Sequence, residues 1–151
     1  MDNNLLSNCS DSKLYGCLFF STTKLARELG RLADEAFSKT GLSPSHAVLL
    51  YIINLKREVQ QKEVGELLHL TPSTITRLVD KLERKGYVKK HSEGKNVCLL
   101  ATEEGLQQQE QIVYSWSQLQ NGYQGVLTEE ESLYYLEMND KLLRKLTGEK
   151  N

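Results

Sequence analysis

The residues with the clearest binding chemistry lie in one basic segment, TPSTITRLVDKLERKG, residues 71–86. Thr71 and Pro72 are a helix-start signal, and the amide groups at a helix N-terminus attract phosphate. Guanidinium groups fit guanine edges, and hydroxyls bond phosphates or base edges. At about 100° per residue, one face of this helix would carry Ser73, Arg77, Asp80 and Arg84, flanked by Thr76 and Lys81. The face predicts nucleic-acid contact, although an ordinary solvated helix face would have the same composition.

The opposite face of the same segment is apolar. Its members fall within about 100° of one another, which is the usual width of a stripe that faces a core; they are Ile75, Leu78, Val79 and Leu82. Gly86 then supplies a residue that tolerates the left-handed conformation at a helix end. The segment is therefore expected to be one amphipathic helix whose polar side is not needed for folding.

Three helices are expected before this segment. Apolar residues recur every three or four positions over residues 12–39, and Ser43-Pro44 begins a second, very apolar helix. A short helix over residues 61–68 is expected to bury Val64, Leu67 and Leu68, with Gly65 as a close contact point. A tight turn, HLT, then joins it to residues 71–86.

A basic hairpin and two helices are expected after it. Residues 87–101 alternate weakly and turn at Glu93-Gly94-Lys95, which predicts two strands. A helix should run from Thr102 to about Gly122, and a capping box formed by Thr128 and Glu131 should open the last one. The predicted order is four helices, two strands and two helices, a mostly α fold.

Length, charge and hydrophobicity limit the functions that the chain can have. The chain has 151 residues and a net charge of −1, but residues 61–100 hold eight Lys/Arg against five Asp/Glu. A basic middle in a slightly acidic chain suggests a local anion site, and a solvated face is the alternative. No run approaches the length of a membrane span, and residues 1–12 lack the order of a signal peptide, so the cytoplasm is the expected location.

Motifs for enzymes and metal centres are missing from the sequence. There is no phosphate-cradling glycine loop, no HExxH and no nucleophile elbow, so no catalytic residue and no cofactor is expected. Cys9, Cys17 and Cys98 are an odd number without CxxC spacing, and His46 and His91 have no partner at a ligand spacing. No metal site is expected.

The short helix, the tight turn, the capped helix and the basic hairpin together predict a winged helix-turn-helix. The segment EVGELLHLTPSTITRLVDKLERKGYVKK, followed by the wing and TEEG, resembles the MarR family of bacterial transcriptional regulators. The likeness centres on residues 59–105, and the flanking helices also occur in the family's order. It implies an N-terminal arm and dimerisation helix over residues 1–42, a DNA-binding domain over 43–101 and C-terminal dimerisation helices over 102–151.

The resemblance also implies a partner and a mechanism. A homodimer would bind an approximately palindromic operator in double-stranded DNA, as a repressor released by a small molecule or an oxidant. The helix at 71–86 would enter the major groove and the hairpin would reach the minor groove. Positions that contact bases or phosphates match Ser73, Thr74, Thr76, Arg77 and Lys81. Other predicted DNA-binding residues are the basic Arg84, Lys89, Lys90 and Lys95. The wing departs from the family's Asp-x-Arg, with Glu93-Gly94-Lys95 in its place.

Two kinds of sensor are possible by family likeness. Tyr15, Phe19 and Tyr51 are candidates for a pocket that takes an aromatic effector, although such side chains also fill dimer cores. Cys17 is a candidate redox sensor, although the family's reactive cysteine would fall nearer Phe19 and a buried inert thiol is the alternative. A winged helix that binds a protein instead of DNA is the rival from another class.

Overall fold

The computed structural model describes residues 16–148, which are mostly helical, as predicted. Two compact units divide the chain, residues 1–119 and 120–151. The elements of the first unit are α3 (Leu18–Phe37), η1 (Ser38–Thr40), α4 (Pro44–Lys56), β1 (Glu58–Gln60), α5 (Gln61–Leu67), α6 (Pro72–Arg84), β2 (Val88–Glu93), β3 (Asn96–Ala101) and α7 (Glu103–Gln107). The next helix, α8 (Gln109–Tyr123), continues into the second unit, which contains α9 (Glu129–Thr147).

The predicted helix starts are confirmed by their caps. The side chain of Ser43 accepts a hydrogen bond from the backbone N–H of His46 at the start of α4. Thr71 caps α6 in the same way through Thr74, and α9 begins with the complete capping box of Thr128. Each cap satisfies an amide that the helix itself leaves without an acceptor.

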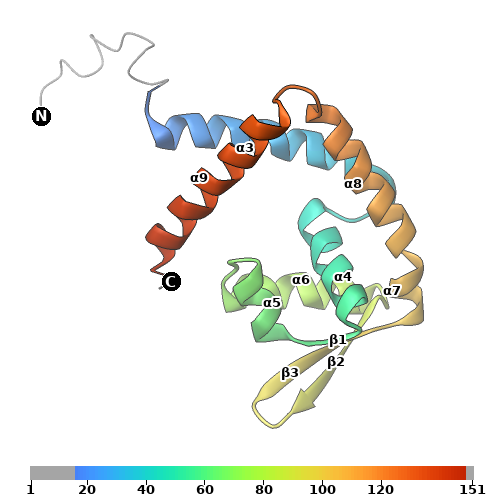
Figure 1. The fold of residues 1–151 in the computed structure, drawn as a ribbon. Helices are drawn as coiled ribbons and strands as arrows, with labels where there is room; N and C mark the ends of the chain where they lie inside the picture. The colour runs from blue at the N-terminus through green and yellow to red at the C-terminus, as the bar shows by residue number, and fades with distance from the viewer. Residues whose placement is uncertain (1–15, 149–151) are drawn as a thin grey trace, which may run out of the picture. The chain divides into compact units, whose positions relative to one another are not determined.

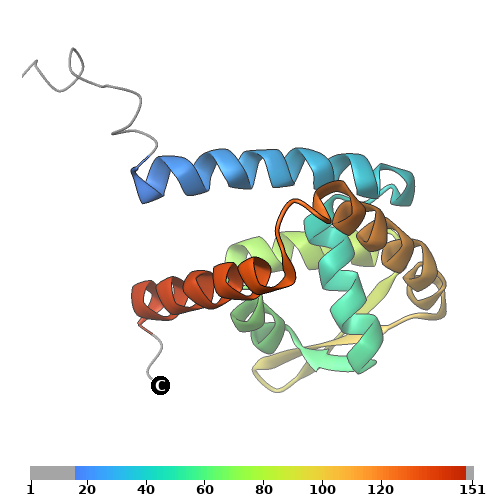
Figure 2. The same cartoon turned by 45° about the horizontal axis from the view of Figure 1, so that its top comes forward.

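The core of the first unit lies where α4, α5 and α6 pack on a small sheet. The predicted stripe of α6 is confirmed, because Ile75, Val79 and Leu82 are buried and Leu78 is partly buried. The three helices lie together in both views, and the hairpin of β2 and β3 extends away from them (Figures 1 and 2). The polar face of α6 is thereby left outside the core.

The sheet contains a third strand that the sequence did not predict. Its order is β1-β3-β2, with every pair antiparallel. β1 has only three residues and no turn that links it to β3, so its pairing of Val59 with Leu99 depends on a long-range contact. The two-strand prediction was therefore wrong by one edge strand.

Two further details differ from the predictions. Leu67 was expected in the core but is 58% exposed, because the buried arc of α5 passes through Val64 and Gly65. The single helix expected after Thr102 is two helices, α7 and α8. The Asn54 side chain donates to the carbonyl oxygen of Gly105 at 2.8 Å, and a side chain that bonds into the helical ladder interrupts it.

Some predictions fall beyond the described part of the chain. The first helix was expected from residue 12, and the described part begins α3 at Leu18; Tyr15 and Cys9 also lie outside. Within residues 16–148, no helix combines the length and the apolar character needed to span a bilayer.

Candidate nucleic-acid interface

The outward face of α6 carries the polar residues that the sequence predicted. Its exposed members come from every turn of the helix, and they are Ser73, Thr76, Arg77, Lys81 and Arg84. Because the buried stripe fixes the rotation of the helix, these side chains share one surface. The structure thus brings the predicted hydroxyl and basic groups together on one helix face.

Hydroxyl groups organise the first turn of α6. The Thr71 hydroxyl oxygen lies 3.0 Å from that of Thr74 and 3.3 Å from that of Ser73. Thr74 is half-buried, so its hydroxyl is less available than that of Ser73. The network holds this turn in place, where the helix presents amide donors suited to an anion.

Gln61 is a residue of the interface that the sequence analysis missed. Its side-chain Nε2 donates to the Thr76 hydroxyl at 3.1 Å, while that hydroxyl donates to the carbonyl oxygen of Pro72 at 2.8 Å. The two bonds fix the Thr76 rotamer from both sides. No local pattern could reveal this contact, because Gln61 and Thr76 are 15 residues apart and belong to different helices.

Lys81 of α6 and Lys85, which directly follows that helix end, act on the nearby His46. Burial lowers the pKa of His46 on α4, and the nearby charges of Lys81 and Lys85 lower it further. A histidine that resists protonation is the effect expected beside clustered cations. This end of α6 carries Lys81 and Arg84, and its carboxylates Asp80 and Glu83 pair with Lys90 of the wing.

The two adjacent lysines of the wing, defined as the hairpin β2–β3, have different environments. The ammonium of Lys90 lies 2.6 Å from Asp80 and 3.6 Å from Glu83, and both carboxylates belong to α6. The hydrogen bond to Asp80 raises the pKa of Lys90, so its charge is held by the protein itself. Lys89 and Lys95 are exposed, and they are the wing cations best placed to meet an external anion.

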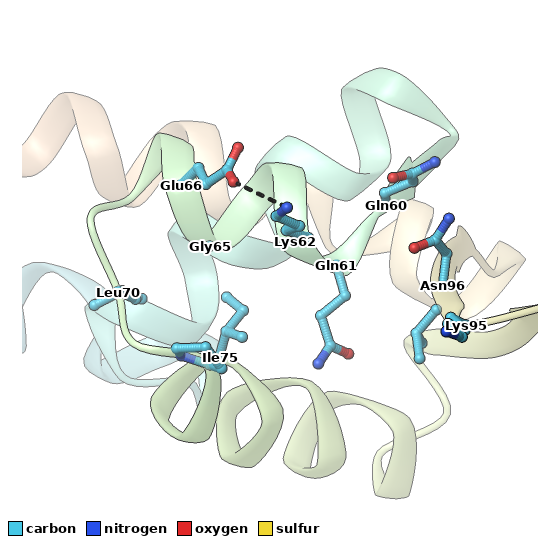
Figure 3. Close-up of a pocket in the computed structure, with 11 residues that line it drawn as sticks. Gln60, Gln61, Lys62, Gly65, Glu66, Leu70, Ile75, Lys95 and Asn96 are labelled. Carbon is cyan, nitrogen blue, oxygen red and sulfur yellow. Dashed lines mark ion pairs between the residues drawn. The ribbon is translucent and has the colours of Figure 1, made fainter. Parts of the chain in front are cut away.

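A hollow of about 410 Å³ separates α5 and the start of α6 from the tip of the wing. Figure 3 shows Gln61 extending from α5 towards α6, with Lys95 and Asn96 on the wing side. The remaining lining residues are Gln60, Lys62, Gly65, Glu66, Leu70, Pro72, Ile75 and Val97. The wing and α6 therefore flank a shared recess.

A close backbone approach anchors the base of the wing. A Cβ atom added at Gly105 would lie 2.1 Å from the carbonyl oxygen of Tyr87, so only glycine fits there. The Thr102 hydroxyl donates to the carbonyl oxygen of Gly86 at 2.7 Å and accepts from the N–H of Gly105 at 3.0 Å. Together these contacts fix α7 against the segment that joins α6 to β2.

The candidate sensor residues occupy separate surroundings. Phe19 is 69% exposed and packs edge-on against Phe20, whereas Tyr51 is half-buried with its ring centroid 6.2 Å from that of Trp116. Cys17 is a half-buried free thiol at the N-cap of α3, and Cys98 is a buried one on β3.

Comparison with known proteins gives one family. The MarR family model matches residues 40–96, the segment that holds α4 to the wing. The transcriptional repressor MdtR of Bacillus subtilis is 26% identical over 111 residues, which cover 72% of each chain. This relative is named as a regulator and not as an enzyme.

Solved structures share the fold. The structure of reduced AbfR bound to DNA matches with a TM-score of 0.72 and 22% identity, covering 91% of this chain and 96% of that one. The PcaV transcriptional regulator of Streptomyces coelicolor, in complex with its natural ligand, matches with a TM-score of 0.78 and 22% identity, covering 86% and 94%. Over residues 40–96 the chain is therefore similar to the MarR family, and it shares the winged-helix fold of solved regulators.

Proposed function

We propose that the chain is a sequence-specific transcriptional regulator that binds double-stranded DNA in the cytoplasm and acts as a repressor. The observation that carries this proposal is the exposed polar and basic face of α6, which stands beside a wing with free lysines. In this reading Arg77 reads bases, while Ser73, Lys81 and Arg84 bind base edges or phosphates. MdtR, which is named as a repressor, and AbfR, whose structure contains DNA, support the assignment.

The recess between α6 and the wing suits the path of DNA. An element in the major groove and another in the adjacent minor groove lie on either side of one sugar–phosphate backbone. The hollow bounded by Pro72 and Lys95 would receive that backbone, with Lys95 pointing to the minor groove. Lys89 and Lys95 would supply wing contacts, and Lys90 would position the wing.

A homodimer completes the proposal. Large apolar side chains are exposed outside the winged helix, on α3 at Leu18, Phe19, Phe20 and Leu25 and on α9 at Leu133, Tyr134, Leu136, Leu142 and Leu146. Such surfaces usually mark an interface. Residues 1–42 and 102–151 would dimerise the protein, and residues 43–101 would bind DNA. Two α6 helices about 34–36 Å apart would then read an approximately palindromic operator.

The signal is proposed to be a small aromatic molecule or an oxidant. PcaV was solved with a natural ligand and AbfR in a reduced form, so relatives of both kinds share this fold. Tyr15, Phe19 and Tyr51 are the proposed effector residues, and Cys17 is the proposed redox residue. A Cys17→Ser variant that stays on DNA after peroxide treatment would support the oxidant. If wild type and Cys17→Ser respond alike, Cys17 is not the sensor.

Selection from fragmented genomic DNA tests the function, followed by fluorescence anisotropy on the selected duplexes at several salt concentrations. We expect a consensus with two-fold symmetry, and a binding constant that falls steeply with salt because phosphate contacts release counterions. Light scattering should give the mass of a dimer. A protein-interaction module would instead select no sequence and show weak salt dependence.

A further inference from the structure

The outer face of the three-stranded sheet brings together side chains that are far apart in the sequence. Side chains alternate along each strand, and Val59, Leu99 and Lys90 share one register position on the face towards the core and α6. Residues of opposite parity lie on the other face, and they include Glu58 on β1, Cys98 on β3, and His91 and Glu93 on β2. Three strands thus bring four potential metal ligands to one face.

Distances support the grouping. The Cys98 sulfur and one carboxylate oxygen from each of Glu58 and Glu93 all lie within 4.8 Å of one another. His91 is the direct cross-strand partner of Cys98, and its Nε2 lies 3.9 Å from a carboxylate oxygen of Glu93. His91 has no partner at a ligand spacing in the sequence, because this neighbour exists only across the hairpin.

Cys98 is buried on the outer face of the sheet beside two carboxylates. Its exposed fraction is 4%, which is in the range of the buried apolar residues. It is covered on the outer face, where the exposed carboxylates of Glu58 and Glu93 approach it. One sulfur and two carboxylate oxygens within 4.8 Å of one another form a donor set that can hold a cation.

We propose that Cys98, His91, Glu58 and Glu93 bind a divalent metal ion of the zinc class on the outer face of the wing sheet. A thiolate, an imidazole nitrogen and two carboxylate oxygens are the donor types that Zn²⁺ takes in tetrahedral sites. On binding, the Cys98 S–H bond breaks, its proton passes to solvent and the thiolate sulfur bonds the metal. The imidazole of His91 binds in its neutral form.

The geometry requires a small contraction. Metal–ligand bonds of about 2.0–2.3 Å place tetrahedral ligand atoms roughly 3–4 Å apart. The flexible side chains of Glu58 and Glu93 can make this change around Cys98 without moving the strands. The exposed imidazole of His91, which is outside the group of ligand atoms within 4.8 Å of one another, must also turn to join them. Since Glu93 directly precedes the Gly94–Lys95 turn, the bound metal would hold the wing tip, and with it Lys95, against β1.

Cobalt(II) titration of the full, metal-free, reduced chain tests the site, with zinc competition to confirm it. We expect one cobalt per chain, a near-ultraviolet band from thiolate-to-cobalt charge transfer, and visible bands of four-coordinate cobalt that zinc abolishes. Cys98→Ser should lose the charge-transfer band. A variant with Cys9→Ser and Cys17→Ser should keep it, which assigns the band to Cys98.

Glu58→Gln removes one proposed ligand without disturbing the fold, because the Glu58 side chain is exposed and glutamine has nearly the same shape. We expect it to weaken cobalt binding about tenfold or more while circular dichroism stays unchanged. Absence of a thiolate band in wild type, or a band that survives in Cys98→Ser, would overturn the proposal. It would also be overturned if Glu58→Gln bound cobalt as tightly as wild type. The cobalt titration contains no DNA, so its failure would overturn the metal site and leave the proposed DNA binding untested by it.

Discussion

Lys90 Nζ, on the wing, lies 2.6 Å from Asp80 Oδ1 on α6. The backbone N–H of Lys90 also donates to Glu83 of the same helix at 3.1 Å. One residue of the wing is therefore bonded through both its main chain and its side chain to the helix proposed to read DNA. This connection ties the wing to α6, the two elements proposed to contact DNA, and it distinguishes Lys90 from the exposed Lys89 and Lys95.

Lys90→Gln and Lys81→Gln should differ in their salt dependence. Lys81 is exposed on the α6 face, so its loss from both protomers of a dimer should reduce the slope of log K against log salt by about 1.8, which is about 0.9 for each phosphate contact. Lys90→Gln should change that slope by less than half as much, since Asp80 and Glu83 already offset its charge. Anisotropy titrations at four salt concentrations measure both slopes. Equal losses would place Lys90 among the phosphate contacts.

Gly105→Ala should destabilise the fold strongly. The new Cβ would meet the carbonyl oxygen of Tyr87 at 2.1 Å, and that backbone cannot move without displacing the base of the wing. We expect the free energy of unfolding to fall by at least about 2 kcal/mol. Urea unfolding followed by circular dichroism gives the value.

Gly65→Ala is the matched control for that experiment. A Cβ at Gly65 would lie 3.6 Å from the carbonyl oxygen of Leu70 and 3.7 Å from Ile75, which is ordinary contact. Replacing a helical glycine should then stabilise α5 by up to about 1 kcal/mol. A stability loss similar to that of Gly105→Ala would refute this steric distinction.

Local signals predicted the helices well, because caps and apolar stripes are properties of neighbouring residues. Ser43, Thr71 and Thr128 each bond an amide within three positions, and the stripe of α6 fixes its exposed face. The caps and the stripe could both be found from residues that are close together in the sequence. The MarR resemblance likewise depended on a contiguous segment, and the family comparison confirms it.

Features that depend on distant partners were missed. The bond from Gln61 to Thr76, the pairing of β1 with β3, and the restraint of Lys90 by Asp80 join separate elements. Lys89 and Lys90 are equivalent in sequence, but strand alternation places them on opposite faces of the sheet. Only the assembled sheet shows this difference.

Stability should fall at mildly acid pH through His46. Its folded-state pKa is below the ordinary 6.5, so below that pH the unfolded chain binds more protons than the folded one. This contribution is present above about pH 6.5 and is lost as the pH falls towards the folded pKa. The difference between wild type and His46→Gln, in urea unfolding from pH 7.5 to 5.5, isolates the effect. A difference that does not vary with pH would contradict it.

Binding of DNA should raise the pKa of His46, which is opposite to the lowering caused by Lys81 and Lys85. Phosphates that neutralise Lys81 and Lys85 would remove part of what lowers the pKa of His46, so binding should take up protons. Affinity for an operator should then rise modestly as the pH falls from 7.5 to 6.5, at constant salt. In His46→Gln the rise in affinity should be smaller. If affinity depends on pH in the variant as it does in wild type, His46 is not the source of the rise.

The cap of α6 should contribute to the stability of the fold. Thr71→Ala removes the acceptor of the Thr74 N–H, and loss of such a cap costs about 1 kcal/mol. Thr71→Ser keeps a hydroxyl in the same place and should restore most of this loss. Thermal unfolding compares the three proteins. Failure of serine to rescue would assign the effect to the threonine methyl group rather than to the cap.

Arg77→Ala gives the most direct test of the central claim, that the exposed face of α6 reads DNA. The measurement is anisotropy on a selected operator and on a scrambled duplex, with Arg31→Ala as the control. Arg31 also carries an exposed guanidinium, but on α3, where it pairs with Glu28 and Glu35. We predict that Arg77→Ala weakens operator binding by about tenfold or more. It should also reduce the ratio of the affinities for the operator and the scrambled duplex, as loss of a base contact does. Arg31→Ala should bind like wild type. Unchanged discrimination by Arg77→Ala would contradict the account.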